Sequence, residues 1–272
     1  MSYAIGIDAS GAQLGAGVVE IDSGRIIRRL ETRTPSNNVA ALRACVGLAE
    51  QLQGVHVIEQ IGIAVPEIVS PRGQIESASK WDWRALDVAA ALAHIAPTQV
   101  HSDVRAAALA EARFGAGADL ECFVFLTIDE GISAVVVRYG VPWQGRCGAA
   151  LVLGVPPIED VASERALSVA VGTQNLSDDL SKPDHQLRVS EAAAVLGKEL
   201  GRVVNLIDPD AVIVGGGLGL NADYREQWVS VMRESVWHRP SSLVPVVAAQ
   251  LGRDAGIIGA AVAPSPNVAA IG

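Results

Sequence analysis

The sequence lacks several features that would assign it to a common class of protein. Its three cysteines, Cys45, Cys122 and Cys147, are far apart and form no CxxC pair, which argues against a disulfide framework and against a structural zinc cluster. The histidines show no HxH or HxxxH spacing. No hydrophobic run is long enough to span a bilayer, and no basic and then apolar segment of a secretory signal follows Met1. We therefore expect a cytoplasmic protein with no membrane partner.

The chain also has no excess of basic residues. It carries 21 Lys and Arg against 30 Asp and Glu, which gives a formal net charge of −9 at pH 7. This balance provides no electrostatic surface for nucleic acid, so we expect no nucleic-acid partner. Of the 272 residues, 50% are hydrophobic, which is enough for a substantial core and argues against disorder.

Strands and helices are predicted in two similar series. YAIGIDASGAQLGAGVVEI at the start predicts a hairpin, RIIRRLETR a third strand, residues 37–52 a helix, and VIEQIGIAV a strand that ends at Pro66. The order then recurs. CFVFLTI and ISAVVVRYG, within residues 122–140, predict a second hairpin, residues 189–206 a helix, and AVIVGGGLG a buried strand that opens into a glycine turn. The polar segment 174–188 is expected to be a surface loop. Two α/β halves with a cleft between them are the simplest architecture.

The glycine turn at Gly215, Gly216 and Gly217 is the first candidate binding element. Glycine tolerates positive φ and lets the backbone approach a ligand closely, so a strand, a glycine run and a helix together can accept a nucleotide. A tight turn between a strand and a helix, without any ligand, explains the same residues equally well.

Two aspartates stand where elements meet. Asp8 ends an apolar strand and could hold Mg²⁺ or orient phosphate, although a turn-capping role explains it too. Asp103 lies where an extended stretch gives way to an alanine-rich helix, so Ser102 or Asp103 could be an ordinary N-cap. A carboxylate there could instead accept the proton of an attacking hydroxyl group. Trp81 and Trp83 flank a polar residue, which suits either carbohydrate binding or core packing.

Five segments occur in one order along the chain. They are DASGAQ at 8–13, GIAVPE at 62–67, SKWDW at 79–83, SDVRAAALAE at 102–111 and NLIDPDAVIVGGGLG at 205–219. In this order they resemble the motifs of the ROK family of sugar kinases and regulators, within the actin-like ATPase superfamily. RDAGIIGAAVA at 253–263 also fits, as the helix that returns to the first lobe. The resemblance covers nearly the whole chain.

The resemblance implies roles for single residues. Asp8 and Gly11 match the first phosphate motif, DxGGTK, and Gly131 matches the second, GTGIG. The glycines at 215–217 match the adenosine side. Asp103 matches the catalytic base, and Ser102 beside it is assigned to the substrate.

The sugar segment and the zinc motifs depart from the family pattern. In the PNxxW segment Trp83 is retained, but Lys80 stands where an asparagine usually contacts a sugar hydroxyl, and Glu67 replaces the glycine of the GIxxPG turn. The ExGH and CxCGxxGC motifs are absent, so no zinc is expected. These altered contacts favour an unusual acceptor, and the added carboxylates would suit a cationic one.

In the second phosphate turn GTGIG is replaced by DEGIS, so Asp129 and Glu130 precede the glycine. The question is whether these carboxylates repel phosphate or help to bind it. Two unit charges about 4 Å apart interact by roughly 4 kcal/mol at an effective dielectric constant near 20, so a carboxylate facing phosphate would be strongly unfavourable. A bound Mg²⁺ would reverse that sign. The side chains could also point away and leave only backbone N–H groups toward phosphate.

The resemblance implies a two-lobed actin-like ATPase (ribonuclease H-like) α/β fold with an interlobe cleft. We expect an N-terminal lobe over 1–102, with a helix at about 256–272 packing on it, and a C-terminal lobe over 103–255. The implied activity is ATP- and Mg²⁺-dependent phosphorylation of a hydroxyl group on a sugar, aminosugar or cyclitol, by a homodimer. One alternative is a catalytically inactive ROK-like binding or regulatory protein. Another is a phosphatase or carbohydrate-modifying enzyme that uses Asp103, Asp129 and Glu130.

Overall fold

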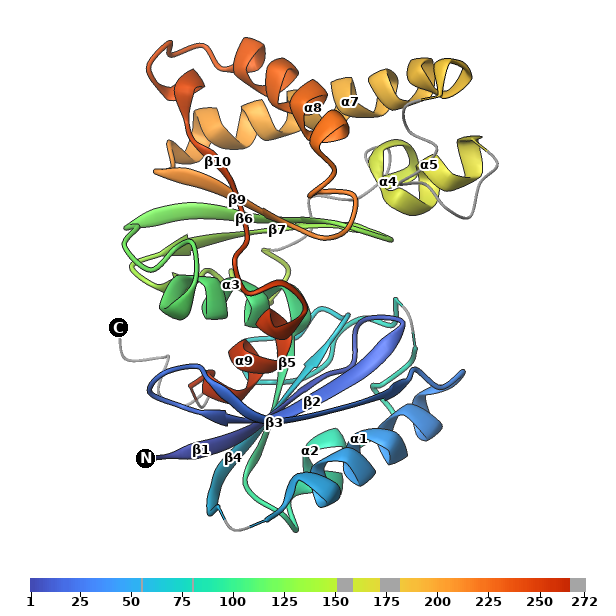
Figure 1. Ribbon diagram of the computed structural model, residues 1–272, viewed down its shortest axis with the longest axis vertical. Helices are drawn as coiled ribbons and strands as arrows, with labels where there is room; N and C mark the ends of the chain where they lie inside the picture. The colour runs from blue at the N-terminus through green and yellow to red at the C-terminus, as the bar shows by residue number, and fades with distance from the viewer. Residues whose placement is uncertain (55, 80, 151–158, 172–181, 265–272) are drawn as a thin grey trace. The chain divides into compact units, whose positions relative to one another are not determined.

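The computed structural model describes residues 1–54, 56–79, 81–150, 159–171 and 182–264 (Figure 1). The chain forms two compact units. The first comprises Met1–Ala118, Val141–Ala150 and Leu251–Gly272, and the second comprises Asp119–Gly140 and Leu151–Gln250.

The first unit extends past residue 102, where the sequence analysis placed the boundary. Helix α3 (Asp103–Phe114) belongs to this unit because its buried side packs on α9 (Ala255–Val262). The helix expected at about 256–272 is α9, which begins at Ala255 and ends at Val262. Residues 265–272 lie outside the described part of the chain. The single turn η2 (Gly252–Asp254) leads into it.

The sheet of the first unit has the order β3-β2-β1-β4-β5. Its strands are β1 (Tyr3–Asp8), β2 (Gln13–Glu20), β3 (Ile26–Arg33), β4 (Ile58–Val65) and β5 (Thr98–Ser102). The two hairpin partners run antiparallel to β1, whereas β4 and β5 continue the sheet in parallel. The predicted hairpin and the strands that follow it are confirmed.

The same three residues, Ile-Gly-Ile, lie side by side in β1 and β4, and they give the sheet two different faces. Residues 5–7 pair in register with residues 61–63. Side chains alternate across a strand, so the isoleucines all point to one face and the two glycines to the other. The isoleucine face packs on α1 (Asn38–Leu52) and α2 (Val88–Leu92).

The glycine face receives α9, which therefore lies directly on the strands (Figure 1). A Cβ atom at Gly6 would lie 1.9 Å from the carbonyl oxygen of Ile257, and one at Gly62 would lie 1.8 Å from that of Ala260. Real Cβ atoms never approach so closely, so only glycine permits this contact between helix and sheet.

The second sheet has the order β10-β9-β6-β7-β8, and its strands belong to the second unit except β8, which is part of the Val141–Ala150 segment of the first. Strands β6 (Cys122–Ile128) and β7 (Ile132–Arg138) form the predicted antiparallel hairpin, β9 (Ala211–Gly215) runs parallel to β6, and β8 (Val141–Pro142) and β10 (Val246–Ala248) are short. Among its described residues, the second unit also contains helices α4 (Glu159–Ala162), α5 (Glu164–Val171), α7 (Pro183–Ile207) and α8 (Ala222–Ser235) and the turn η1 (Ser241–Leu243). One apolar core joins α7 and α8 to β6 and β9.

Helix α7 begins earlier than the sequence indicated. Residues 183–188 belong to the helix, although they were expected to lie in a surface loop over 174–188, most of which falls outside the described residues. The physical reason is Pro183 at the first helical turn, where its missing N–H costs nothing and its fixed φ favours the helix. Proline here starts a helix rather than marking a loop.

The three cysteines are free thiols. None of the helices in the described ranges combines the length and the apolar character that crossing a membrane would require.

Candidate functional site

Asp8 ends β1, where the chain turns away from the sheet. Its Oδ1 accepts hydrogen bonds from the Ser10 backbone N–H at 3.0 Å and the Ser10 hydroxyl at 2.6 Å. Its Oδ2 faces the first turn of α9, because a Cβ atom at Gly256 would lie 2.2 Å from that oxygen. The turn-capping role considered for Asp8 is therefore present, and it fixes the carboxylate at the carboxyl end of the strand. Gly11 lies exposed in the same turn.

Asp103 is the first residue of α3. Its Oδ1 accepts a hydrogen bond from the Val104 N–H at 2.7 Å. Desolvation by burial, followed by the nearby charges of Asp8 and then Glu67, raises the pKa of Asp103 to about 7. Ser102 occupies the N-cap position and is buried, but its side chain makes no capping hydrogen bond. A carboxyl group with a pKa near neutrality suits general-base chemistry.

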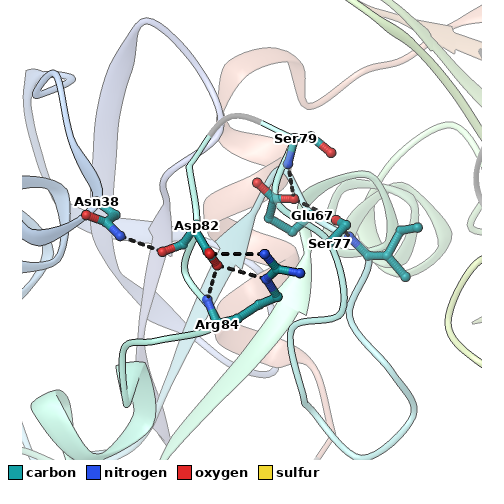
Figure 2. Close-up of polar contacts among 7 residues, drawn as sticks. Asn38, Glu67, Ser77, Ser79, Asp82 and Arg84 are labelled. Atoms are coloured by element: carbon teal, nitrogen blue, oxygen red, sulfur yellow. Dashed lines mark hydrogen bonds and ion pairs between the residues drawn. The ribbon is translucent and has the colours of Figure 1, made fainter.

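Glu67, which replaces a turn glycine, is buried in the loop after β4. It is only 3% exposed, and it accepts hydrogen bonds from the Ser77 hydroxyl at 2.6 Å and the Ser79 N–H at 2.7 Å (Figure 2). The Ser77 hydroxyl in turn accepts one from the Ile68 N–H at 2.8 Å. Glu67 thus ties the two ends of its loop together and adds negative charge near Asp103.

The predicted sugar segment has one accessible end and one buried end. Lys80 lies outside the described residues. Trp83 is 0% exposed and belongs to the hydrophobic core, with its ring edge-on to Trp81 at a centroid distance of 5.6 Å. Of the two roles considered for Trp83, core packing is the one that this structure shows, and its ring is not accessible to a sugar. At the surface Arg84 makes a two-point ion pair with Asp82, at 2.8 and 3.0 Å (Figure 2).

In the second unit the glycine turn lies on the end of β6. Gly215 is the last residue of β9, and Gly216 has φ of +84°. A Cβ atom at Gly216 would lie 2.3 Å from the carbonyl oxygen of Ile128, which accepts a hydrogen bond from the Gly219 N–H at 3.0 Å. The parallel pairing of β6 and β9 therefore brings the Gly215–Gly217 turn beside the hairpin turn that contains Gly131.

The acidic hairpin turn finds a partner that the sequence did not reveal. A Cβ atom at Gly217 would lie 3.7 Å from Asp129 Oδ1 and 3.8 Å from Glu164 Oε2, so both carboxyl groups border the glycine turn. Burial, a hydrogen bond with Asp129, and the charges of Asp129 and Glu130 raise the pKa of Glu164. A proton shared by the pair would remove one of the negative charges that the turn otherwise carries.

The residues fit a magnesium ion in a limited way. Mg²⁺ is usually held by one or two carboxylates and takes its other ligands from water and phosphate. Asp8 offers such a carboxylate on a rigid strand end. Within the described ranges no group of three or more His, Cys, Asp or Glu side chains could enclose a metal ion. The donor set therefore suits Mg²⁺ carried in with phosphate rather than a metal bound by protein ligands alone.

A model of the ROK family matches residues 4–164 and 155–264 of this chain. The chain belongs to the ROK family. It is 28% identical to the polyphosphate glucokinase of Mycobacterium tuberculosis (strain ATCC 25618 / H37Rv), over 96% of this chain and 91% of that protein. It is 27% identical to the glucokinase of Streptomyces coelicolor, over 96% of this chain and 97% of that protein.

Solved ROK structures have the same fold. A ROK family glucokinase from Streptomyces griseus, in complex with glucose and AMPPNP, superimposes with a TM-score of 0.80 at 25% identity, covering 96% of this chain and 98% of that one. The ROK hexokinase from Thermus thermophilus gives 0.79 at 28% identity, covering 98% and 99%. The predicted family and the actin-like ATPase fold class are confirmed.

Two features of this ROK chain escaped the sequence analysis. Glu67 was noted only as a departure from a glycine, and Glu164 was not noted at all. The serines ten and twelve residues after Glu67 are a weak signal for a loop closed by a carboxylate. No signal pointed to Glu164, because it is far from Asp129 in sequence.

Proposed function

We propose that this protein is a kinase that transfers the terminal phosphoryl group of ATP to a hydroxyl group of a sugar, aminosugar or cyclitol. The observation that carries the proposal is Asp103, a carboxyl group at the start of α3 whose pKa is raised to about 7. The similarity to ROK proteins named glucokinase and polyphosphate glucokinase supports the same reaction.

In the proposed reaction Asp103 accepts the proton of the acceptor hydroxyl as its oxygen attacks the terminal phosphorus, and the bond from that phosphorus to the leaving diphosphate breaks. A base with a pKa near 7 is about half ionised at neutral pH, so it can accept this proton without first being deprotonated at high pH. Asp8 would hold Mg²⁺, which neutralises phosphate charge when bound. The glycines at 11, 131 and 215–217 would offer backbone N–H groups to the nucleotide, and Ser102 and Lys80 would contact the acceptor.

The test is a screen of sugars, aminosugars and cyclitols with ATP and Mg²⁺, in which the diphosphate product is measured by a coupled assay. We expect turnover that Asp103→Asn lowers by a factor on the order of 10² to 10⁴, since Asn cannot accept the proton. Asp87→Asn is the matched control, because Asp87 also lies at a helix start of the same unit, and Asn caps a helix as well as Asp. Turnover that persists in Asp103→Asn would contradict the assigned base.

The donor is decided in the same assay. Polyphosphate in place of ATP tests the second donor that the relatives' names raise. A homodimer acting in the cytoplasm, where ATP is available, is part of the proposal. Light scattering after size-exclusion chromatography measures the mass, and a monomer at micromolar concentration would remove that part.

A sugar-binding protein that transfers no phosphate is the second candidate, and the carboxyl pair beside Gly217 favours it. Under this alternative, calorimetry detects a sugar ligand but no ATP·Mg²⁺ binding at concentrations up to millimolar. Micromolar ATP·Mg²⁺ affinity would exclude it.

A further inference from the structure

Arg105 occupies an unfavourable place for a cation. It lies in the first turn of α3, two residues after Asp103, and is only 7% exposed. The N-terminal end of a helix carries partial positive charge and so repels a guanidinium group. Burial lowers the pKa of Arg105 to about 10. A buried cation at this position requires specific compensating contacts.

Two backbone carbonyl groups provide those contacts. Nη1 of Arg105 donates to the Gly148 oxygen at 2.9 Å, and Nη2 donates to the Val69 oxygen. Gly148 has φ of +76°, and a Cβ atom there would lie 2.1 Å from the same Val69 oxygen. The two backbone segments thus touch, and one planar guanidinium group holds both. Lysine, with a single ammonium centre, cannot reproduce this fork.

The segment held at Val69 is the loop that carries Glu67. Val69 bridges to Ile75, and the Ser70 N–H donates to the Gln74 oxygen at 2.8 Å, so the loop continues as a small hairpin. Its start contains Glu67, whose charge acts on Asp103. The contact made by Arg105 therefore connects the helix that positions Asp103 with the loop that borders it.

We propose that Arg105 is a positioning residue of the acceptor site, whose fork fixes the 67–75 loop and the segment around Gly148 against the first turn of α3. This inference rests on the proposed function and extends it, because it identifies the contact that sets where the acceptor hydroxyl lies relative to Asp103. Arg105 takes no part in the proton transfer itself.

Hydrogen exchange tests the contact without any need for catalysis. In the full chain, Arg105→Gln removes the charge and the fork, and Arg105→Lys keeps the charge but loses the fork. Peptides covering 68–76 and 144–150 should exchange faster by about tenfold in both variants, while the β6–β7 hairpin stays unchanged. Arg113→Gln is the matched control, since Arg113 also donates to a backbone carbonyl, that of Val262 at 3.0 Å, from the last turn of the same helix.

Steady-state kinetics then test the role. We expect both Arg105 variants to lower kcat/KM for the acceptor by a factor on the order of 10², because the acceptor is misplaced, while KM for ATP and all constants of Arg113→Gln stay near wild type. Equal losses for acceptor and ATP would mean general destabilisation and would overturn the positioning role. Unchanged exchange at 68–76 in a folded variant would refute the contact. If Arg105→Gln does not fold, Arg105→Lys decides.

The two proposals fail in different ways. Wild-type protein that turns over no acceptor with either donor refutes the proposed kinase and, with it, the acceptor-site role. The exchange result still decides whether Arg105 holds the two segments. Turnover in the wild type with normal acceptor kinetics in both Arg105 variants refutes only the further inference.

Discussion

Replacing Asp103 by Asn should stabilise the protein at neutral and alkaline pH while strongly lowering its proposed activity. The raised pKa of Asp103 means that the folded state holds a proton more tightly than the unfolded state, whose ordinary value is 3.8. Between these two values the folded state therefore binds more protons, so stability falls as pH rises through the window from about 4 to 7. Asn has the shape of the protonated form and does not titrate, so the variant lacks this loss.

The magnitude follows from the shift. One pKa unit corresponds to about 1.4 kcal/mol. As the pH rises from 5 to 8, the free energy of unfolding of the wild type should therefore fall by about 2–3 kcal/mol. Part of the residue's surface is exposed, which makes this figure an upper bound. The hydrogen bond from the Val104 N–H to Oδ1 survives in Asn, so it does not contribute to the difference.

Urea unfolding at pH 5, 6, 7 and 8, followed by tryptophan fluorescence and circular dichroism, measures the effect. The free energy of unfolding of Asp103→Asn, minus that of wild type, should grow with pH and level off above about 7. Asp87→Asn supplies the control for a surface Asp at a helix start, and its difference from wild type is subtracted. A difference for Asp103→Asn that stays constant from pH 5 to pH 8 would refute the desolvation of this carboxyl group.

Three further predictions concern packing and charge. Gly62→Ala should prevent soluble folding, because its Cβ would lie 1.8 Å from the Ala260 oxygen. Gly47→Ala, in helix α1 with no atom within 4 Å of the new Cβ, should instead raise the free energy of unfolding by up to about 1 kcal/mol. Equal behaviour of the two variants in expression and urea unfolding would contradict the close contact at Gly62. Glu111→Gln should lower the free energy of unfolding by about 1–3 kcal/mol. The buried carboxylate accepts hydrogen bonds from two backbone N–H groups, one on each oxygen, and the NH₂ group of Gln would face one of these donors. An unchanged free energy in urea unfolding would count against this prediction. Glu164→Gln should tighten ATP binding at pH 8, because it removes a carboxylate beside the Gly215–Gly217 turn. Calorimetry that shows equal or weaker ATP binding than wild type would argue against a nucleotide bound at this turn.

Local patterns in the sequence predicted most of the fold. The β-rich runs near residues 3–21 and 57–65 identified β1, β2 and β4. That α9 would pack on Gly6 and Gly62 was not predicted, because the contact joins segments about 200 residues apart. The start of α7 was missed, because a polar segment with a proline looks the same whether the proline ends a loop or begins a helix. What distinguishes a helix from a loop here is the packing of its apolar side, and this packing involves strands and helices elsewhere in the second unit.

The candidate site was predictable only where it depends on strand ends and helix starts. Asp8 and Asp103 could be located because each terminates or begins an element that the sequence reveals. Contacts between distant segments could not be read in the same way. Arg105 reaches carbonyl groups 36 and 43 residues away, and nothing in its neighbours along the chain indicates them.

The acidic turn shows the same limit most clearly. From the sequence, Asp129 and Glu130 either repel phosphate, bind a metal ion or point away. The structure adds a third carboxyl group, that of Glu164, which hydrogen-bonds with Asp129. Sharing a proton is an outcome that charges counted from sequence alone do not include.

The close packing of α9 on the first sheet also has a consequence for folding during translation. Residues 1–118 emerge early, but the helix that covers Gly6 and Gly62 ends only at Val262. At typical elongation rates the uncovered strands wait on the order of ten seconds for it, and the second unit is made meanwhile. During that interval the glycine face of the first sheet lacks the helix that covers it in the finished protein.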